Sequence, residues 1–380
     1  MKIGLLSVQN HNYGSILQAY ALQSCLQQLG HQPEIICYKK TNYVKQAARL
    51  LYYPLLKATF LAKWKTLYLK TKKKDIYKDI ILTREKSFSD FANENFLYSR
   101  VYVGRNDLIS GTYDYDCFVL GSDQVWNPMN LGGDFFTMTF IPDQIKKITY
   151  APSFGVSKIP DNQRKKTAEY LRRIDSISVR EAEGVSIIKE LTGRDVPQVV
   201  DPTILAGREL WDSRIGARLI NEDYVFCYFI SANPKYREYA KSLASKVGLK
   251  IVTIPFVDEF VKADDGFGDI IPKSVGPLEF VNLIGNAKYV CTDSFHGSVF
   301  SVLYEVPFFT FSRYRKDTED STNSRLYSFL NMIGMEYRLR SEDDKVENES
   351  LSEVDFTPAK DKLESKRKES LQFLKSALEG

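Results

Sequence analysis

Residues 292–300, with the sequence TDSFHGSVF, place a histidine, two serines and a glycine where a predicted strand gives way to a predicted helix. The free backbone N–H groups of a helix start, together with the helix dipole, favour the binding of a phosphate. A histidine at the same point can donate a proton to a substrate that this phosphate anchors. We therefore expect His296 to be a catalytic acid, beside an anion site formed by Ser294, Gly297 and Ser298. The alternative is that Ser294 only caps the helix and that His296 is packed against its neighbours.

A second strand-to-helix turn lies at residues 9–15, with the sequence QNHNYGS and a single glycine. It lacks the G-x-G-x-x-G pattern of dinucleotide-binding turns, and the chain contains no Walker A pattern, so we expect neither a dinucleotide nor ATP. Asn12 and Ser15 could cap the helix that follows. The polar amides beside Tyr13 would equally suit the hydroxyl groups of a sugar.

Arginine side chains follow predicted strands in both parts of the chain. Arg180 comes directly after one strand, and Arg313, Arg315 and Arg325 follow the last one. A guanidinium group can hold a carboxylate or a phosphate through two parallel hydrogen bonds. Because a single surface arginine is more often a solvated charge, an anion site requires several of these side chains to converge on one cleft.

Two β-α-β patterns predict the fold class. Each begins with strand, helix and strand, at residues 3–8, 15–29 and 34–38 in the first pattern and at 224–230, 235–247 and 250–254 in the second. Such units form parallel sheets, so we expect an α/β protein with two Rossmann-like domains facing a central cleft. The predicted divisions are an N-terminal domain at 1–206 with a helical insert at about 42–95, a C-terminal domain at 207–355 and a C-terminal helix at 356–380. Ligands of open α/β sheets bind beyond the carboxyl ends of the strands, which is where the polar turns described above lie.

The composition excludes several classes of protein. A length of 380 residues is more than a single hydrophobic core usually supports. The five cysteines are dispersed without C-x-x-C spacing, which favours reduced thiols in the cytoplasm, and with three histidines we expect no metal site. No apolar run is long enough for a transmembrane helix, and the N-terminal apolar run is too short for a signal peptide.

Positive charge is concentrated in residues 39–74, which contain eleven Lys or Arg side chains and no acidic one. Leucines and aromatic residues alternate with these charges. A helical hairpin with its apolar face in the core would explain the pattern, and so would an amphipathic element at a membrane surface. Because the basic run is local, we do not expect nucleic-acid binding.

Seven segments, in order between residue 3 and about residue 330, resemble the polysaccharide pyruvyl transferase family. They are NYG at 12–14 with LQAYAL at 17–22, GSDQVWN at 121–127, YAPSFG at 150–155, SVRE at 178–181, VDPT at 200–203, DSFHG at 293–297 and NSR at 323–325. No segment is diagnostic alone, but the ordered set is specific.

This resemblance implies a GT-B-like fold, phosphoenolpyruvate as donor, a sugar hydroxyl pair as acceptor and no cofactor. The pyruvyl group would be transferred as a cyclic ketal, with release of phosphate, in the biosynthesis of capsule or exopolysaccharide. His296 would be the catalytic acid, and Arg180 would grip the donor. Several relatives carry an arginine where this chain has Ser294, and we expect Arg313 or Arg325 to supply the missing charge.

The acceptor is expected against the N-terminal domain. The side chains that would bind its hydroxyl groups or stack on its ring are Asn12, Tyr13, Gln124, Trp126 and Ser153. Asp123 would act as the base, unless it only caps the turn after its strand. The acceptor would be linked to a nucleotide or to a lipid diphosphate, and in the second case residues 39–74 would contact the inner face of the plasma membrane.

Two other functions are compatible with the same sequence features. A GT-B glycosyltransferase would share the fold and the cleft histidine but would bind a nucleoside diphosphate sugar. A non-catalytic carbohydrate-binding protein of this fold would tolerate the serine at position 294, whereas the presence of Arg180 and His296 favours an enzyme.

Overall fold

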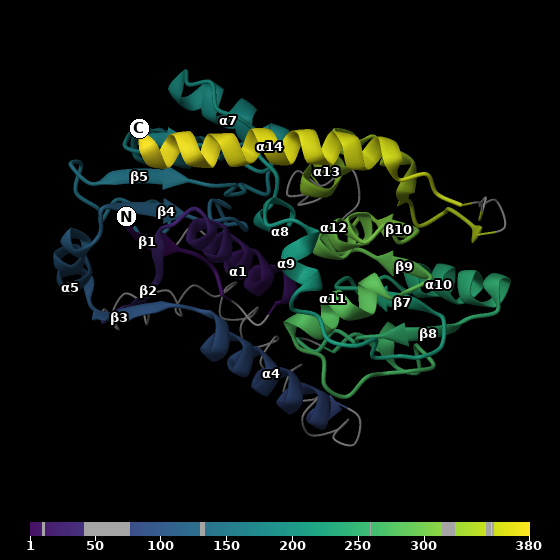
Figure 1. Ribbon diagram of the computed structural model, residues 1–380. Helices are drawn as coiled ribbons and strands as arrows, with labels where there is room; N and C mark the ends of the chain where they lie inside the picture. Colours follow the sequence, from purple (N-terminus) through teal and green to yellow (C-terminus); the bar gives the residue numbers. More distant parts are fainter. Residues whose placement is uncertain are drawn as a thin grey trace.

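Two parallel β-sheets with helices packed around them form the molecule, which we describe from a computed structural model (Figure 1). The structure describes residues 1–9, 12–41, 77–129, 134–258, 260–313, 324–346, 351 and 353–380. The strand order is β3-β2-β1-β4-β5-β6 in the first sheet and β11-β10-β9-β7-β8 in the second. The prediction of two Rossmann-like sheets in a GT-B-like α/β fold is therefore confirmed. We call the first sheet with its helices the N-terminal lobe and the second sheet with its helices the C-terminal lobe.

The N-terminal lobe is built around β1 (Lys2–Leu6), which pairs with β2 (Gln32–Lys39) on one side and with β4 (Cys117–Leu120) on the other. Its residues 3–6 are all buried, as expected for a central strand of a sheet covered on both faces. Helix α1 (Tyr13–Gln28) connects β1 to β2. The other elements are α4 (Asp79–Asn95), β3 (Tyr98–Val103), α5 (Arg105–Ser110), a 3₁₀ turn (Gly111–Asp114), β5 (Lys146–Thr149), α6 (Asp161–Arg172), β6 (Ser176–Ile177) and α7 (Ala182–Thr192).

The C-terminal lobe repeats this plan around β7 (Tyr224–Tyr228), which lies between β8 (Lys250–Thr253) and β9 (Tyr289–Thr292). All five residues of β7 are buried. The other elements are α10 (Pro234–Val247), a 3₁₀ turn (Lys262–Asp264), α11 (Pro277–Gly285), α12 (Phe295–Leu303), β10 (Phe308–Phe311), α13 (Ser324–Ile333), a 3₁₀ turn (Glu336–Arg338) and β11 (Leu339–Arg340).

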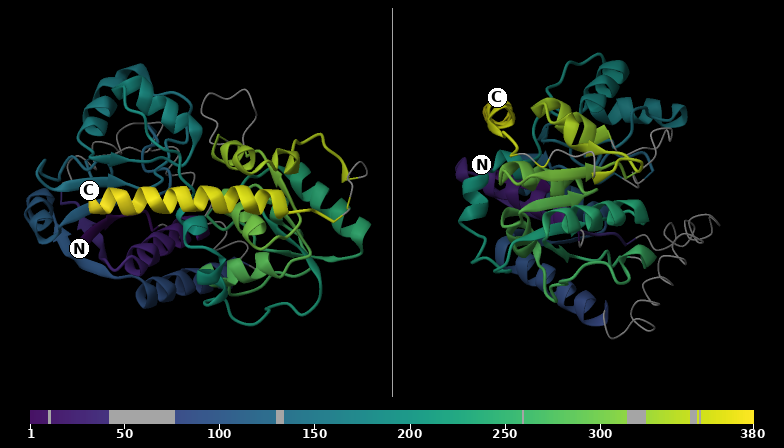
Figure 2. Two further views of the ribbon diagram at one scale, coloured as in Figure 1. Left: turned by 45° about the horizontal axis from the view of Figure 1, so that its top comes forward. Right: turned by 90° about the vertical axis from the view of Figure 1, so that its right-hand side faces the viewer.

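The chain passes between the lobes twice. It first crosses through the short helices α8 (Pro202–Leu205) and α9 (Arg208–Asp212), where the predicted boundary at residue 206 falls. It returns through α14 (Thr357–Glu379), which runs along one side of both lobes (Figures 1 and 2). The hydroxyl of Ser370 on α14 accepts a hydrogen bond from the backbone N–H of Val200 at 3.0 Å. Near the end of α14, the Lys146 amine donates to the carbonyl of Leu378 at 3.3 Å.

Aromatic side chains join the lobes at their interface. The ring of Tyr13, at the start of α1, stacks on Phe280 of α11 with a centroid distance of 4.6 Å. Tyr228 and Phe88 pack against the same ring at 5.6 and 5.0 Å. The Tyr13 hydroxyl donates to the carbonyl of Val275 at 3.0 Å. This packing fixes the start of α1 against the C-terminal lobe.

Helix α4 makes a second connection, on the side of the molecule opposite α14 (Figure 1). The Arg84 guanidinium pairs with Asp258 of the C-terminal lobe at 2.8 Å, and the Thr83 hydroxyl donates to the carbonyl of Lys273 at 2.6 Å. The lobes are therefore held together on two sides, which limits their relative movement.

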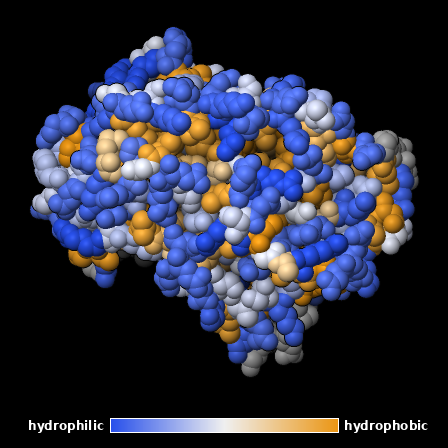
Figure 3. Space-filling view, viewed as in Figure 1, coloured by the Kyte–Doolittle hydropathy of each residue, from blue (hydrophilic) through white to orange (hydrophobic). Residues whose placement is uncertain are grey.

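The predicted helices of the basic stretch 39–74 lie outside the described residues, apart from residues 39–41. Within the described part of the chain, no helix combines the length and the apolar character needed to cross a membrane. Hydrophilic residues cover most of the face shown in Figure 3, with smaller apolar areas between them.

Candidate active site

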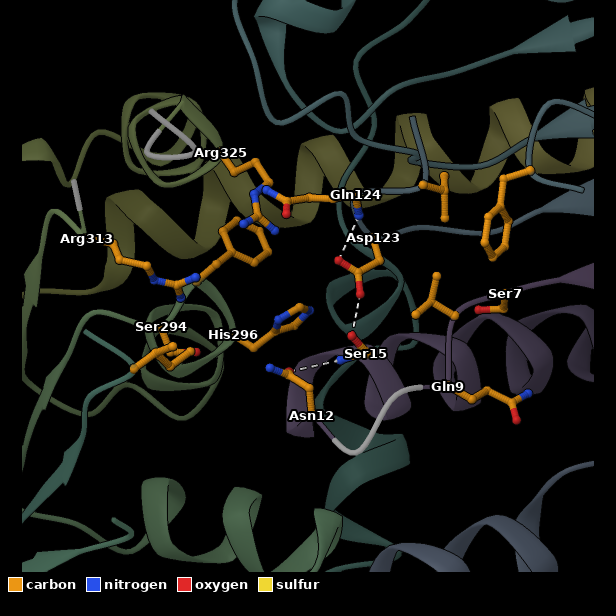
Figure 4. A pocket seen from close by; sticks show the side chains of 15 residues that line it. Ser7, Gln9, Asn12, Ser15, Asp123, Gln124, Ser294, His296, Arg313 and Arg325 are labelled. Atoms are coloured by element: carbon orange, nitrogen blue, oxygen red, sulfur yellow. Dashed lines mark hydrogen bonds between the residues drawn. The ribbon is translucent and has the colours of Figure 1, made fainter. Parts of the chain in front are cut away.

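A pocket of about 650 Å³ lies where the lobes meet, at the carboxyl ends of strands from both sheets. β1 and β4 contribute from the N-terminal lobe, and β7, β9 and β10 contribute from the C-terminal lobe. The pocket is lined by Ser7, Val8, Gln9, Asn12, Ser15, Asp123, Gln124, Val125, Phe136, Ile230, Ser294, Phe295, His296, Arg313 and Arg325. In Figure 4, His296, Arg313 and Arg325 face Asn12, Ser15 and Asp123 across this space. The position agrees with the general rule for ligand sites of open α/β sheets.

Asp123 follows β4 and has a left-handed backbone, with φ of 81°. An aspartate tolerates this conformation better than most residues do. Its carboxylate accepts hydrogen bonds from the Ser15 hydroxyl and, at 2.8 Å, from the backbone N–H of Gln124. Burial by itself would raise the pKa of Asp123. The charges of Arg180 and Arg325, together with these two hydrogen bonds, outweigh burial, so the pKa of this carboxyl lies below its usual value and the group is ionised at neutral pH.

Three arginines surround one side of the pocket. Arg313 and Arg325 line it, while Arg180 is 5% exposed and lies 4.9 Å from the ring of the lining residue Phe295. The Arg325 guanidinium lies 5.9 Å from the same ring. Nε of each of these arginines, and Nη2 of Arg180, are buried without a hydrogen-bond partner among the described residues. Unpaired guanidinium N–H groups are costly to bury, which favours an anion in the adjoining space.

The charges of these arginines affect one another. Burial, reinforced by the charges of Arg180 and Arg313, lowers the pKa of Arg325 to about 10. The negative charges of Asp123 and Glu181 act in the opposite direction. An anionic ligand beside Arg325 would relieve the repulsion among the three guanidinium groups.

His296 is 7% exposed and lines the pocket from the first turn of α12. Its Nε2 lies 3.5 Å from Oδ1 of Asp201, an ion-pair distance that is long for a hydrogen bond. The other nitrogen, Nδ1, adjoins Gly14, where a Cβ atom would be only 2.0 Å away. The two helix starts therefore meet at this ring.

Asp201 connects His296 to Arg180. Its Oδ2 pairs with Nη1 of Arg180 at 2.7 Å, and both side chains are almost completely buried. Burial alone would raise the pKa of Asp201, but the neighbouring His296 and Arg180 hold this pKa well below its usual value. Asp201 also caps α8 by accepting from the backbone N–H of Thr203 at 3.0 Å.

The start of α12 does not offer all its backbone N–H groups to an anion. The Ser294 side chain accepts from the backbone N–H of Gly297 at 3.3 Å, so the cap considered from the sequence is present. The Ser298 hydroxyl is buried and donates to Thr310 at 2.8 Å. Gly297 packs against Thr292, whose Oγ1 would be 2.7 Å from a Cβ atom at this glycine. Ser294 thus lines the pocket, whereas Gly297 and Ser298 do not.

The residues predicted for the acceptor divide in the same way. Asn12 and Gln124 line the pocket. The side chain of Asn12 caps α1 by accepting from the backbone N–H of Gly14 at 2.9 Å, and Nε2 of Gln124 is buried without a partner among the described residues.

Three of the predicted acceptor residues lie outside the pocket lining. Tyr13 is part of the aromatic interface described above. Trp126 is fully buried and donates to the carbonyl of Phe136 at 3.0 Å, and the Ser153 hydroxyl donates to Glu181 at 2.8 Å. These three side chains are packed inside the protein and do not line the pocket.

Asp201 and Glu181 are site residues that the sequence patterns did not single out. Both occur in segments that carry the family resemblance, VDPT and SVRE, and both carboxylates are buried. Asp201 directly follows the apolar pair Val199-Val200, a signal that could have found it, whereas Arg180 separates Glu181 from its strand. Among the described residues, no group of three or more His, Cys, Asp or Glu side chains could hold a metal ion.

Comparisons with known proteins give a family and a set of distant structural likenesses. The family model for polysaccharide pyruvyl transferase matches residues 12–314. No curated protein is significantly similar to the chain. A UDP-GlcNAc 2-epimerase from Neisseria meningitidis bound to UDP-GlcNAc is 9% identical, with a TM-score of 0.49, over 89% of this chain and 93% of that one. For a UDP-GlcNAc 2-epimerase from Methanocaldococcus jannaschii the values are 11%, 0.49, 98% and 93%, and for a glycosyltransferase from Streptomyces nogalater they are 10%, 0.45, 100% and 97%.

Proposed function

The chain belongs to the polysaccharide pyruvyl transferase family, and we propose on this basis that it moves the pyruvyl group of phosphoenolpyruvate onto a pair of sugar hydroxyls. The product is a cyclic ketal, and phosphate is released. The observation that carries the proposal is the convergence of His296, Arg313 and Arg325 on one pocket, with Arg180 packed against the same wall.

Phosphoenolpyruvate carries a carboxylate and a phosphate, and both anions match the guanidinium groups. Arg313 and Arg325 are the cations that line the pocket in the described part of the chain, and each has a buried, unpaired Nε. They are the candidates for the charge that relatives obtain from an arginine at position 294. Arg180 pairs with Asp201 through Nη1, but its Nε and Nη2 lack partners among the described residues, so it can also attract the donor.

The proposed reaction takes up one proton at C3 and releases two from the sugar hydroxyls. His296 gives a proton to C3 of phosphoenolpyruvate, which turns the methylene into the methyl group of the ketal and leaves positive charge on C2. One sugar hydroxyl attacks C2, the bond between C2 and the phosphate oxygen breaks, and the second hydroxyl closes the ring. Of the two hydroxyl protons, one replaces the proton taken up at C3 and the other leaves with phosphate.

Asp123 would act on the acceptor side of this reaction. A carboxylate with a lowered pKa is a weak base, but a hydroxyl that has attacked a cationic carbon becomes strongly acidic, so a weak base suffices. The same negative charge would stabilise the positive charge that develops on C2.

The pocket has room for both substrates. Its volume of about 650 Å³ lies within the usual range of small-molecule sites. The donor would occupy the side near Arg313 and Arg325. The acceptor sugar would lie toward Gln9, Asn12 and Gln124, whose amides can bind hydroxyl groups.

The test is release of phosphate from phosphoenolpyruvate by the purified protein, with nucleotide-linked, lipid-linked and simple glycosides as acceptors and mass spectrometry of the products. A pyruvyl adduct on one acceptor is the expected result. Absence of any adduct, together with thermal stabilisation by a nucleoside diphosphate but not by phosphoenolpyruvate, would instead support a glycosyltransferase.

A role in capsule or exopolysaccharide assembly, in the cytoplasm, follows from the same proposal. If the acceptor is carried on a lipid diphosphate, the basic stretch 39–74 would bind the anionic inner face of the plasma membrane. Flotation with anionic liposomes at low salt tests this contact. A protein that stays entirely in the soluble fraction would exclude it.

A further inference from the structure

Asp201 lies at the point where the chain leaves the N-terminal lobe, and its carboxylate is placed between two side chains that the proposed reaction uses. Arg180 approaches one oxygen at 2.7 Å, and His296 approaches the other at 3.5 Å. The side chain of Asp201 has no exposed surface. This is the only carboxylate within ion-pair distance of His296 among the described residues.

The two nitrogens of the His296 ring have different surroundings. Nε2 is buried without a hydrogen-bond partner among the described residues, and it lies 3.5 Å from Oδ1 of Asp201. Nδ1 has no hydrogen-bond partner among the described residues and borders Gly14. Since a Cβ atom at position 14 would fall 2.0 Å from Nδ1, this edge of the ring packs directly on the backbone of α1, and only glycine fits beside it.

A buried carboxylate beside one imidazole nitrogen fixes the tautomer of the ring. Nε2 can reach only Asp201, so the proton that stays on the neutral ring belongs on Nε2. Because Nε2 is buried while His296 lines the pocket, Nδ1 then remains as the nitrogen that can exchange a proton with a bound molecule. The long Nε2–Oδ1 distance agrees with this role, because such contacts are often loose before the substrate binds.

We propose that Asp201 is a positioning residue for His296. Its carboxylate keeps a proton on Nε2 of the ring, so that Nδ1 is the atom that protonates the substrate. This inference rests on the proposed function for the identity of the proton acceptor. In the step, the doubly protonated imidazolium transfers its Nδ1 proton to C3 of phosphoenolpyruvate. The ring remains neutral, with its Nε2 proton directed at Asp201, while Arg180 balances the charge of the carboxylate.

The direct test is nitrogen NMR of the wild-type protein with ¹⁵N-labelled histidine. The chain has three histidines, so single substitutions assign the signals. The expected spectrum of His296 shows, once the ring is neutral, a protonated Nε2 and an unprotonated Nδ1. A neutral ring with its proton on Nδ1 would overturn the proposal, and this measurement requires neither a variant nor activity.

The second test is Asp201→Asn, in which a carboxamide replaces the carboxylate. The expected spectrum contains the Nδ1-protonated tautomer, and kcat falls on the order of 10²–10⁴-fold, the usual contribution of a general acid. Wild-type tautomer and kcat in this variant would contradict the proposal.

A matched control separates positioning from the loss of a buried ion pair. Arg237 and Asp264 form such a pair at 2.7 Å in the C-terminal lobe, with both side chains buried, and neither lines the pocket. Asp264→Asn should therefore cost stability as Asp201→Asn does, while it leaves the tautomer of His296 unchanged. A tautomer change in both variants would assign the effect to general loosening and refute a specific role of Asp201.

The proposed pyruvyl transfer and the proposed role of Asp201 can be disproved independently of each other. If the wild-type protein forms no pyruvyl adduct but shows the expected tautomer, the proposed function is wrong and the role of Asp201 in orienting the ring stands. If adducts form and the tautomer is the other one, Nδ1 is not the proton donor.

Discussion

The three arginines of the site reach it from different parts of the chain. Arg180 lies before α7 of the N-terminal lobe, Arg313 follows β10, and Arg325 lies in the first turn of α13. On an exposed surface water would solvate each guanidinium group. Here all three groups have buried nitrogens that lack partners among the described residues. At the scale of single residues, the site gathers buried guanidinium groups whose unpaired N–H groups cost free energy unless a ligand binds them.

His296→Ala should lower kcat by about 10²–10⁴-fold, because general acid catalysis contributes about that much. The buried imidazole packs against Gly14 and lies beside Asp201, so the variant should lose some thermal stability but remain folded. Steady-state kinetics with phosphoenolpyruvate and circular dichroism measure the two effects. Normal turnover in this variant would remove His296 from the mechanism.

Arg325→Ala should raise KM for phosphoenolpyruvate roughly ten- to one-hundred-fold, since a hydrogen bond to a charged group contributes about 1.5–3 kcal/mol. Arg105, whose exposed guanidinium pairs with Asp134 at 2.6 Å, provides the matched control. Arg105→Ala should leave KM within experimental error. Equal KM values for the two variants would mean that Arg325 does not contact the donor.

Acid should destabilise the protein through Asp123 and Asp201. Both pKa values are lower in the folded state than in an unfolded chain, so their contribution is complete above the unfolded value of about 4 and is lost as the pH falls through the folded values. Chemical denaturation between pH 7 and pH 3 should show this loss. Asp123→Asn should make the dependence shallower, and an unchanged slope would contradict the lowered pKa.

At the scale of elements, the site depends on two helices whose N-termini meet. Asn12 caps α1 and Ser294 caps α12, and the ring of His296 occupies the space between the two starts. The position of each start is encoded locally, by a short polar cap after an apolar strand. Their close approach is not local, because it depends on the packing of one lobe against the other.

Gly14→Ala tests this approach. In an ordinary helix the change adds about 1 kcal/mol of stability, but here the new Cβ would be 2.0 Å from Nδ1 of His296. We expect a loss of stability of about 1–3 kcal/mol from overpacking, together with reduced kcat. Gly216→Ala is the control, since nothing lies within 4 Å of a Cβ atom at that position. A Gly14→Ala variant as stable and active as wild type would show that the ring has room to move.

The difference between local patterns and contacts across the lobes explains which features the sequence could predict. The ends of apolar strands are local patterns, and Asp123 and His296 do lie just beyond the ends of β4 and β9. Whether an aromatic ring stacks on a sugar or fills a core is decided by tertiary packing, and Tyr13 and Trp126 fill cores. The contact between Asp201 and His296 joins segments that are far apart in the chain, and no periodicity in a single sequence indicates it.

At the scale of the whole molecule, the pocket exists because both lobes contribute to its wall and are held together by α4 and α14. The described contacts of α14 with the N-terminal lobe include hydrogen bonds to Val200, Leu205 and Lys146. A change far from the pocket can therefore alter the relative position of its two sides.

Ser370→Ala should test this connection. The variant leaves the buried backbone N–H of Val200 without its partner, which should lower the free energy of unfolding by about 1–3 kcal/mol. Ser376→Ala, at an exposed position on the same helix, should change it by less than about 0.5 kcal/mol. Equal values for the two variants in urea denaturation would show that α14 is not anchored through Ser370.

The return of α14 to the N-terminal lobe has a consequence for synthesis on the ribosome. The first sheet is complete in sequence once β6 has emerged, but the residues that contact Val200 and Leu205 belong to α14, about 180 residues downstream of β6. N-terminal domains usually fold first during translation. Here part of the surface of the early lobe would stay uncovered until α14 has been synthesised, so this lobe could not reach its final packing when its own strands have emerged.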